Sequence, residues 1–238
     1  MKKFIILFAL LGFNVFAEIP NQGIATYKQT INIHASLPES QAAMKAFIPE
    51  FNYMEITVSY KDHNLRFDNK PLIDEKTKNT SNIMSVDTQN MLFNSQDMIY
   101  TQYGNIVDVD YVFTKNYAQD DRIKLTDEHK KVNGYDCKKA IDTKNKLVIW
   151  YQEDKNQRVI PTEIMAKVPG LVVKVEGKKI SYDLLSIKAA KISDSIFDVP
   201  KNSKKISEEQ YQDLQEEAME EMMSSMGGNV KMIKTEGQ

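Results

Sequence analysis

Cysteine is almost absent from this 238-residue chain, which has only Cys137. One thiol cannot close an internal disulfide, so the fold must depend on its hydrophobic core. A lipid-anchored protein would need a cysteine directly after the N-terminal apolar run, and none stands there. Lys138 and Lys139 beside Cys137 raise the alternative of a reactive thiol. We favour the commoner role, a buried cysteine that packs as a small hydrophobic side chain.

Histidine is also scarce, and the residues His34, His63 and His129 are too far apart to form a metal-binding helical pair. The sequence lacks the H-E-x-x-H, G-x-S-x-G, P-loop, dinucleotide-glycine and EF-hand patterns. Asp108 and Asp110 alternate with valines, which favours solvated carboxylates on a strand over a hydrolytic pair. We therefore predict a protein that is not an enzyme and has no cofactor or metal centre.

Long apolar runs are missing except at the N-terminus. Lys2 and Lys3 precede an apolar run over residues 4–13, and the small residue Ala17 follows. This is the three-part pattern of a secretory signal peptide over residues 1–17. The alternative, a membrane anchor, needs about 20 apolar residues, and Asn14 and Glu18 come too early. We expect a periplasmic or secreted protein that is soluble after cleavage, with one domain over residues 18–226 and a flexible tail over 227–238.

Charge of one sign is not concentrated, since the net charge is −2 and no basic stripe occurs. Nucleic-acid binding is therefore not expected.

The dominant pattern in the rest of the chain has a period of two. Residues 52–61 alternate Met54, Ile56, Val58 and Tyr60 with polar residues, which is typical of a half-buried strand. Residues 65–67 are expected to pair with it after a turn at 62–64. Further strands are predicted at 24–33, 90–93, 98–103, 107–113, 135–142, 146–151, 162–166, 171–176 and 179–190, with tight turns at 104–105 and 177–178. The spacing predicts a mainly β (α+β) fold, a curved antiparallel sheet or open half-barrel.

Two helices are predicted to accompany the sheet, one over residues 38–48 and one over 207–226. The second begins with Ser207 and Gln210 in the spacing of a capping box. Its apolar half carries methionines and its other half is acidic. Docking on the sheet is the favoured role of this helix. The alternatives are a mobile lid over an apolar ligand, and soft-metal (copper) binding by its methionines.

The second half of the chain resembles a known family. The segment Gly134-Tyr135-Asp136-Cys137-Lys138-Lys139-Ala140 is similar to the "GY-C-KA" strand of the GLPGLI family, and residues 147–151 are similar to its following strand. Pro169, Gly170 and Leu171 match the motif that names the family, whereas Lys167, Val168 and Val172 depart from it. Residues 195–200 resemble the "F-x-x-P" close of lipoprotein-carrier-like envelope domains. The resemblance implies an exported protein of the Bacteroidota cell envelope, with helices on the concave side of a curved sheet, and it transfers no biochemical role. Pro169 and Gly170 are interpreted as a structural turn or bulge.

Our leading hypothesis is an envelope protein that binds a lipid or another apolar ligand on the concave face of the sheet. The predicted ligand-binding residues are Met54, Ile56, Val58, Tyr60, Val173, Val175, Met219, Met222 and Met226. The alternatives are a structural or protein-interaction module without a ligand, which would bind another envelope protein, and a copper-binding protein.

Overall fold

In the computed structural model, the structure describes residues 19–72, 87–106 and 108–225. The predicted signal peptide at 1–17 and the predicted tail at 227–238 lie outside these residues, as does Met226. Within them, no helix is long and apolar enough to cross a membrane.

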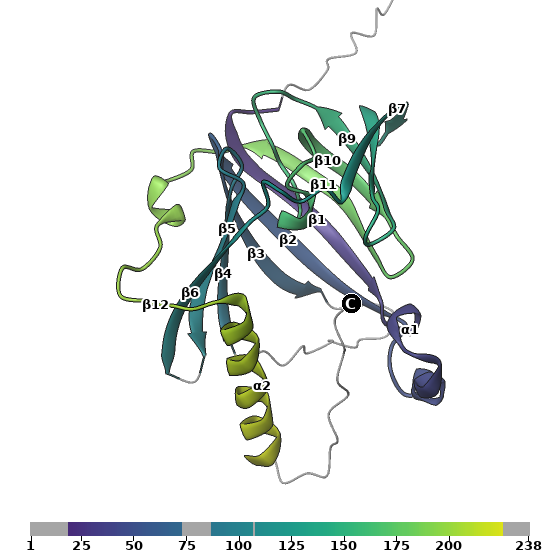
Figure 1. Ribbon diagram of the computed structural model, residues 1–238. Helices are drawn as coiled ribbons and strands as arrows, with labels where there is room; N and C mark the ends of the chain where they lie inside the picture. Colours follow the sequence, from purple (N-terminus) through teal and green to yellow (C-terminus); the bar gives the residue numbers. More distant parts are fainter. Residues whose placement is uncertain (1–18, 73–86, 107, 226–238) are drawn as a thin grey trace, which may run out of the picture.

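The described chain forms one open, curved sheet of twelve strands, as the sequence predicts (Figure 1). The spatial order is β12-β6-β5-β4-β3-β2-β1-β11-β10-β9-β8-β7, and every neighbouring pair is antiparallel except β12 and β6. The strands are β1 (Gln22–Asn32), β2 (Phe51–Lys61), β3 (Asn64–Leu72), β4 (Asp87–Asn94), β5 (Ile99–Ile106), β6 (Val109–Asn116), β7 (Ile123–Val132), β8 (Tyr135–Asp142), β9 (Leu147–Glu153), β10 (Gly170–Glu176), β11 (Ile180–Ala189) and β12 (Lys204–Lys205).

Five helical segments accompany the sheet in the described residues: α1 (Ile33–Ser36), η1 (Glu39–Ala46), η2 (Glu163–Met165), η3 (Asp194–Phe197) and α2 (Glu208–Ser225). The predicted C-terminal helix is confirmed with its capping box: the Ser207 backbone N donates to Gln210 Oε1 at 2.9 Å, and the Gln210 backbone N donates to Ser207 Oγ at 3.1 Å. The helix predicted at 38–48 is instead the 3₁₀ segment η1. None of its residues is buried, so no packed face supports a longer α-helix.

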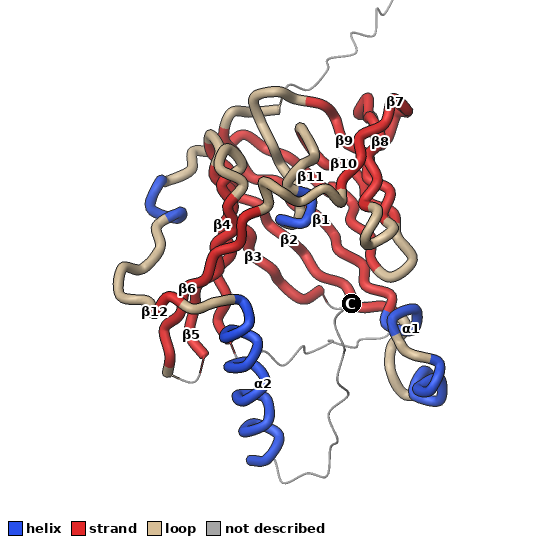
Figure 2. Tube along the Cα trace, in the orientation of Figure 1, coloured by secondary structure: helices blue, strands red, loops and turns tan. Residues whose placement is uncertain are grey.

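The segment between β9 and β10 fills part of the concave side of the sheet. Figure 2 shows it, with η2, between the two arms of the sheet formed by β4–β6 and β7–β11. Val159, Ile160 and Met165 from this segment are fully buried. The hydroxyl of Tyr27 on β1 lies 2.9 Å from the carbonyl oxygen of Val172 and 3.3 Å from that of Val159, which fixes the segment to the sheet. The strand predicted at 162–166 is wrong: residues 163–165 form η2, and the adjacent side chains Met165 and Ala166 are both buried, whereas a strand would turn them to opposite faces.

Two further predictions need correction. The turn predicted at Gly104-Asn105 is wrong, because both residues pair with β6 and the reversal comes later, beside Asp108 with a φ of 66°. Ile106, which is 1 % exposed, continues the buried pattern of β5 past the glycine. The predictions also missed β7, an edge strand whose residues are mostly charged and exposed.

Candidate functional site

A cavity of about 810 Å³ lies on the concave side of the sheet. One wall is the N-terminal half of α2, and the floor is formed by β5 and β6. The opposite wall is formed by η2 and by two neighbouring hairpin turns, β8–β9 and β10–β11. The site therefore joins segments that are more than 100 residues apart in the sequence.

The floor of the cavity is aromatic and is built where α2 docks. Tyr211 on α2 lies against Phe113 and Tyr111 of β6, with ring centroids 4.9 and 5.1 Å apart. Tyr211 and Ala218, on the apolar half of the helix, are buried, so this half docks on the sheet as predicted. This packing holds α2 over β5 and β6.

Polar atoms are placed among these rings. The Tyr100 hydroxyl donates to Gln102 Oε1 at 2.8 Å, and Gln102 Nε2 donates to the Tyr111 hydroxyl at 3.1 Å. Burial raises the pKa of Tyr100, and negative charge at Glu163 raises it further. The pKa of Tyr117 is raised for the same two reasons, again mainly by burial. The floor thus presents neutral hydroxyl groups at every ordinary pH.

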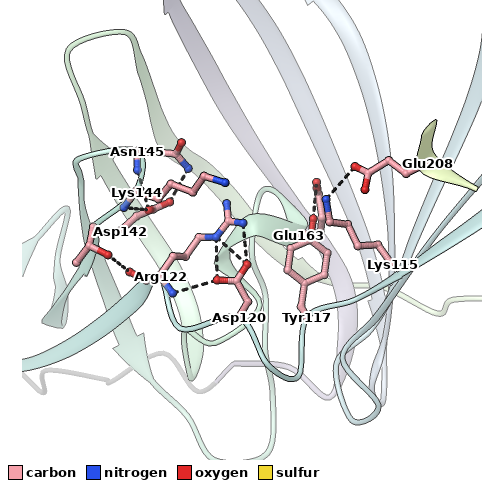
Figure 3. A network of polar contacts seen from close by, with 10 residues as sticks. Lys115, Tyr117, Asp120, Arg122, Asp142, Lys144, Asn145, Glu163 and Glu208 are labelled. Atoms are coloured by element: carbon pink, nitrogen blue, oxygen red, sulfur yellow. Dashed lines mark hydrogen bonds and ion pairs between the residues drawn. The ribbon is translucent and has the colours of Figure 1, made fainter. Parts of the chain in front are cut away.

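The charges that line the cavity are mostly positive. Six basic side chains contribute to the lining, and only two acidic ones, Glu163 and Glu208, do so. Lys115 Nζ lies 2.8 Å from Glu208 Oε1, and Glu163 Oε1 accepts from the Tyr117 hydroxyl at 3.4 Å (Figure 3). Both carboxylates of the lining are therefore engaged by neighbouring side chains.

The buried carboxylate of Asp142 anchors the β8–β9 turn. It accepts from the backbone N of Lys144 at 3.0 Å, and from the backbone N and Nδ2 of Asn145 at 2.9 and 2.7 Å. Asp120 and Arg122 support the same turn: they form an ion pair of 2.7 Å, and the Arg122 carbonyl accepts from Thr143 (Figure 3). The hydrogen bonds between the two side chains raise the pKa of Arg122 and lower the pKa of Asp120.

The family model described as "N-glycanase peptide, N-terminal domain" matches residues 60–215. The chain belongs to this family. The matched range spans every residue that lines the cavity, because these residues lie between Tyr100 and Gln215.

Solved structures of PNGF-II in two crystal forms, C2 and P21, share the fold of this N-glycanase N-terminal domain. Their TM-scores are 0.58 and 0.52, each at 18% sequence identity and with 83% of this chain covered. The matches cover 33% and 34% of the PNGF-II chains, so this chain spans about a third of their length. No curated protein matches the chain. Neither structure bears on the resemblance to the GLPGLI family, which stays a prediction.

None of the eight predicted ligand-binding residues that the structure describes lines this cavity. Ile56, Val58 and Tyr60 are at most 3 % exposed and belong to the hydrophobic core, as do Val173 and Val175. Met54 is half-buried on β2. Met219 and Met222 are half-buried on α2, beyond the part of the helix that lines the cavity. In the sheet, β1 and β11 lie between β2, which carries Met54 to Tyr60, and β10, which carries Val173 and Val175.

The predicted motif residues occupy structural positions. Gly134 has a φ of 87° in the turn between β7 and β8, and Tyr135 begins β8. Gly170 has a φ of 129° at the start of β10, where a Cβ atom would meet the carbonyl oxygen of Gln152. Pro169 precedes it and Leu171, fully buried, follows it, which agrees with the predicted structural turn.

Cys137 is 1 % exposed, and burial raises the pKa of its thiol to about 11. This confirms the prediction of a buried cysteine that packs as a small hydrophobic side chain. No group of three or more His, Cys, Asp or Glu side chains that could hold a metal ion occurs among the described residues. The sequence predicted none of the residues that line the cavity, aromatic or polar, because they come from separate strands and turns and form no motif.

Proposed function

We propose that this chain is a glycan-binding module of an exported protein, with the cavity beside α2 as its binding site. The observation that carries this proposal is the cavity itself. Its volume of about 810 Å³ lies in the range of ligand pockets, and its lining combines aromatic rings with polar groups. The name N-glycanase in the family description points to glycans as the class of ligand.

The polar lining supports a glycan more than a lipid. Gln212 and Gln215 on α2 and Asn145 in the β8–β9 turn bring amide groups to the wall. Amide and tyrosine hydroxyl groups are suited to the hydroxyls of a sugar because they donate and accept hydrogen bonds. Five of the apolar residues that the sequence suggested for a lipid pack into the core instead: Ile56, Val58, Tyr60, Val173 and Val175. An interaction module and a copper site at the methionines of α2 stay predictions.

Binding without cleavage is the second part of the proposal. Glu163 and Glu208, the carboxylates of the lining, already contact Tyr117 and Lys115, respectively. A general acid or base needs a free path to the reacting atom. These contacts support a site that holds its ligand unchanged.

The test introduces a larger side chain into the cavity at a position on α2. Gln212 is exposed and lines the cavity, whereas its neighbour Asp213 is exposed and does not. We expect Gln212→Trp to weaken the binding of a biantennary N-glycan at least about tenfold in isothermal titration calorimetry, since an indole occupies space that the glycan needs. Asp213→Trp, the matched control, should bind as the parent protein does. Equal binding by both variants, or no glycan binding by the parent protein, would refute the proposal.

Export is proposed from the N-terminal sequence. The expected mature N-terminus is Glu18, after cleavage behind Ala17. Mass spectrometry of the protein recovered from the cell envelope or the medium tests this expectation. Recovery of the uncleaved chain from the cytoplasm alone would contradict it.

A further inference from the structure

The basic character of the cavity contrasts with the rest of the chain. The whole protein has a net charge of −2, yet six basic side chains and two acidic ones line the cavity. Two of the six form ion pairs, Lys115 with Glu208 and Arg122 with Asp120. The other four have no ion pair within residues 19–72, 87–106 and 108–225. They are Lys144, Lys146, Lys178 and Lys179.

These four lysines come from two hairpin turns that contact each other. The turns β8–β9 and β10–β11 lie at the same end of neighbouring hairpins. Gly177 in one turn packs so closely on Leu147 at the end of the other that a Cβ atom would collide with the leucine side chain. The four lysines therefore lie on two turns that pack against each other at one edge of the cavity. We call this group the lysine rim.

Lys146 has a backbone conformation that residues other than glycine seldom adopt, and it shares this conformation with Asp62, Met98, Asp108 and Asn133 elsewhere in the chain. Lys146 has a φ of 56°, in the left-handed region where glycine or asparagine is usual. The buried Asp142 fixes the preceding residues of the turn. Lys146 lines the cavity from a position where a glycine would fit the backbone better.

We infer that the lysine rim recognises the anionic groups of an acidic glycan, such as the carboxylates of its terminal sugars or sulfate substituents. This inference rests on the proposed glycan-binding function and specifies the class of glycan. The hydroxyl and amide groups of the floor and of α2 contact the neutral sugars, while the rim contacts the acidic end. Lysine suits this role because its ammonium group is a mobile point charge that bonds carboxylates and sulfates in many directions.

The test compares glycans that differ only in charge. One probe is a disialylated biantennary N-glycan, and the second is the same glycan with both carboxylates converted to amides. We expect the mature protein to bind the acidic form about tenfold more tightly in calorimetry, because several exposed charge pairs each contribute modestly. This preference should fall as salt is raised. A sulfated neutral glycan distinguishes recognition of sulfate from recognition of carboxylate.

The variant for this test is Lys144→Gln/Lys146→Gln/Lys178→Gln/Lys179→Gln, with each turn also changed separately as a pair in case the quadruple variant does not fold. The matched control removes four exposed lysines away from the cavity: Lys45→Gln/Lys155→Gln/Lys188→Gln/Lys201→Gln. We expect the rim variant to bind both glycans within about twofold of each other, and the control to keep the preference.

The possible failures are distinguishable. If the parent protein binds neither the acidic nor the sulfated glycan more tightly than the amidated one, the lysine-rim inference is overturned and the glycan-binding proposal stands. Binding of none of the glycans would refute the proposed function itself. Tighter binding of a glutamate-rich peptide of the same charge would assign the rim to a protein partner and overturn the inference.

Discussion

The carboxylate of Asp142 binds Asn145 twice, through the backbone N at 2.9 Å and through Nδ2 at 2.7 Å. A third hydrogen bond, from the backbone N of Lys144, completes the set. Asp142 is fully buried at the end of β8, so the turn that carries half of the lysine rim is anchored in the interior.

We expect Asp142→Ala to lower the free energy of unfolding by about 2 kcal/mol, because three hydrogen-bond donors of the turn lose a charged, buried acceptor. Urea unfolding measures the change. Asp136→Ala on the same strand is the control: Asp136 is half exposed and lies 3.8 Å from Lys131, so the expected change is below about 0.5 kcal/mol. Equal effects of the two substitutions would show that the turn does not depend on Asp142.

Lys146 gives a prediction in which stability and binding move in opposite directions. Because its φ is 56°, Lys146→Gly should raise the free energy of unfolding by about 1 kcal/mol. The same substitution should weaken binding of the acidic glycan. Lys144→Gly, at a position without positive φ, should lower stability by about 0.5 kcal/mol instead. A loss of stability in Lys146→Gly would contradict the assigned backbone strain.

Alanine substitutions at two glycines with positive φ are expected to lower the stability by very different amounts. At Gly170 a Cβ atom would meet the Gln152 carbonyl oxygen and the Asp154 backbone N, the latter at 2.7 Å. At Gly134 nothing lies within 4 Å. Gly170→Ala should therefore cost at least about 3 kcal/mol or prevent folding, and Gly134→Ala about 1 kcal/mol. Thermal unfolding compares them, and a smaller loss in Gly170→Ala than in Gly134→Ala would refute the packing described at β10.

The buried thiol of Cys137 predicts that the stability of the protein falls at alkaline pH. Burial raises the pKa of its thiol to about 11 in the folded state, against about 8.5 in an unfolded chain. Between these values the unfolded state loses its proton first, so the contribution of Cys137 to stability is constant below about pH 8.5 and falls as the pH rises to about 11. The parent protein should lose more stability over this interval than Cys137→Ala does.

The thiol should also react with Ellman's reagent at pH 8 only in urea. Complete labelling of the native protein within minutes would show that Cys137 is accessible and ionised.

The parts of the fold that the sequence predicts well are those fixed by local pattern. Alternation along residues 52–61 predicts β2, and the Ser207 and Gln210 spacing predicts the start of α2. The errors arise where tertiary structure decides. β7 has too many charges to show alternation, and Met165 is buried in the core as part of the short helix η2.

The cavity was harder to predict than the sheet. Its lining brings together residues such as Tyr100, Lys144, Lys179 and Gln212, which are separated in sequence and have no motif in common. Only the order of the strands places the β8–β9 and β10–β11 turns opposite α2. The apolar residues predicted on β2 and β10 do not line this cavity, because the side chains of Ile56, Val58, Tyr60, Val173 and Val175 pack in the hydrophobic core.

The position of the bound ligand is best settled by a crystal structure of the mature protein with the disialylated N-glycan. We expect density for the glycan between α2 and the lysine rim, with its sugars within hydrogen-bond distance of Gln212 and a carboxylate near Lys144 or Lys179. Density for the glycan only on the opposite face of the sheet, or at the exposed segment around Phe47, would contradict the assignment of the cavity as the binding site.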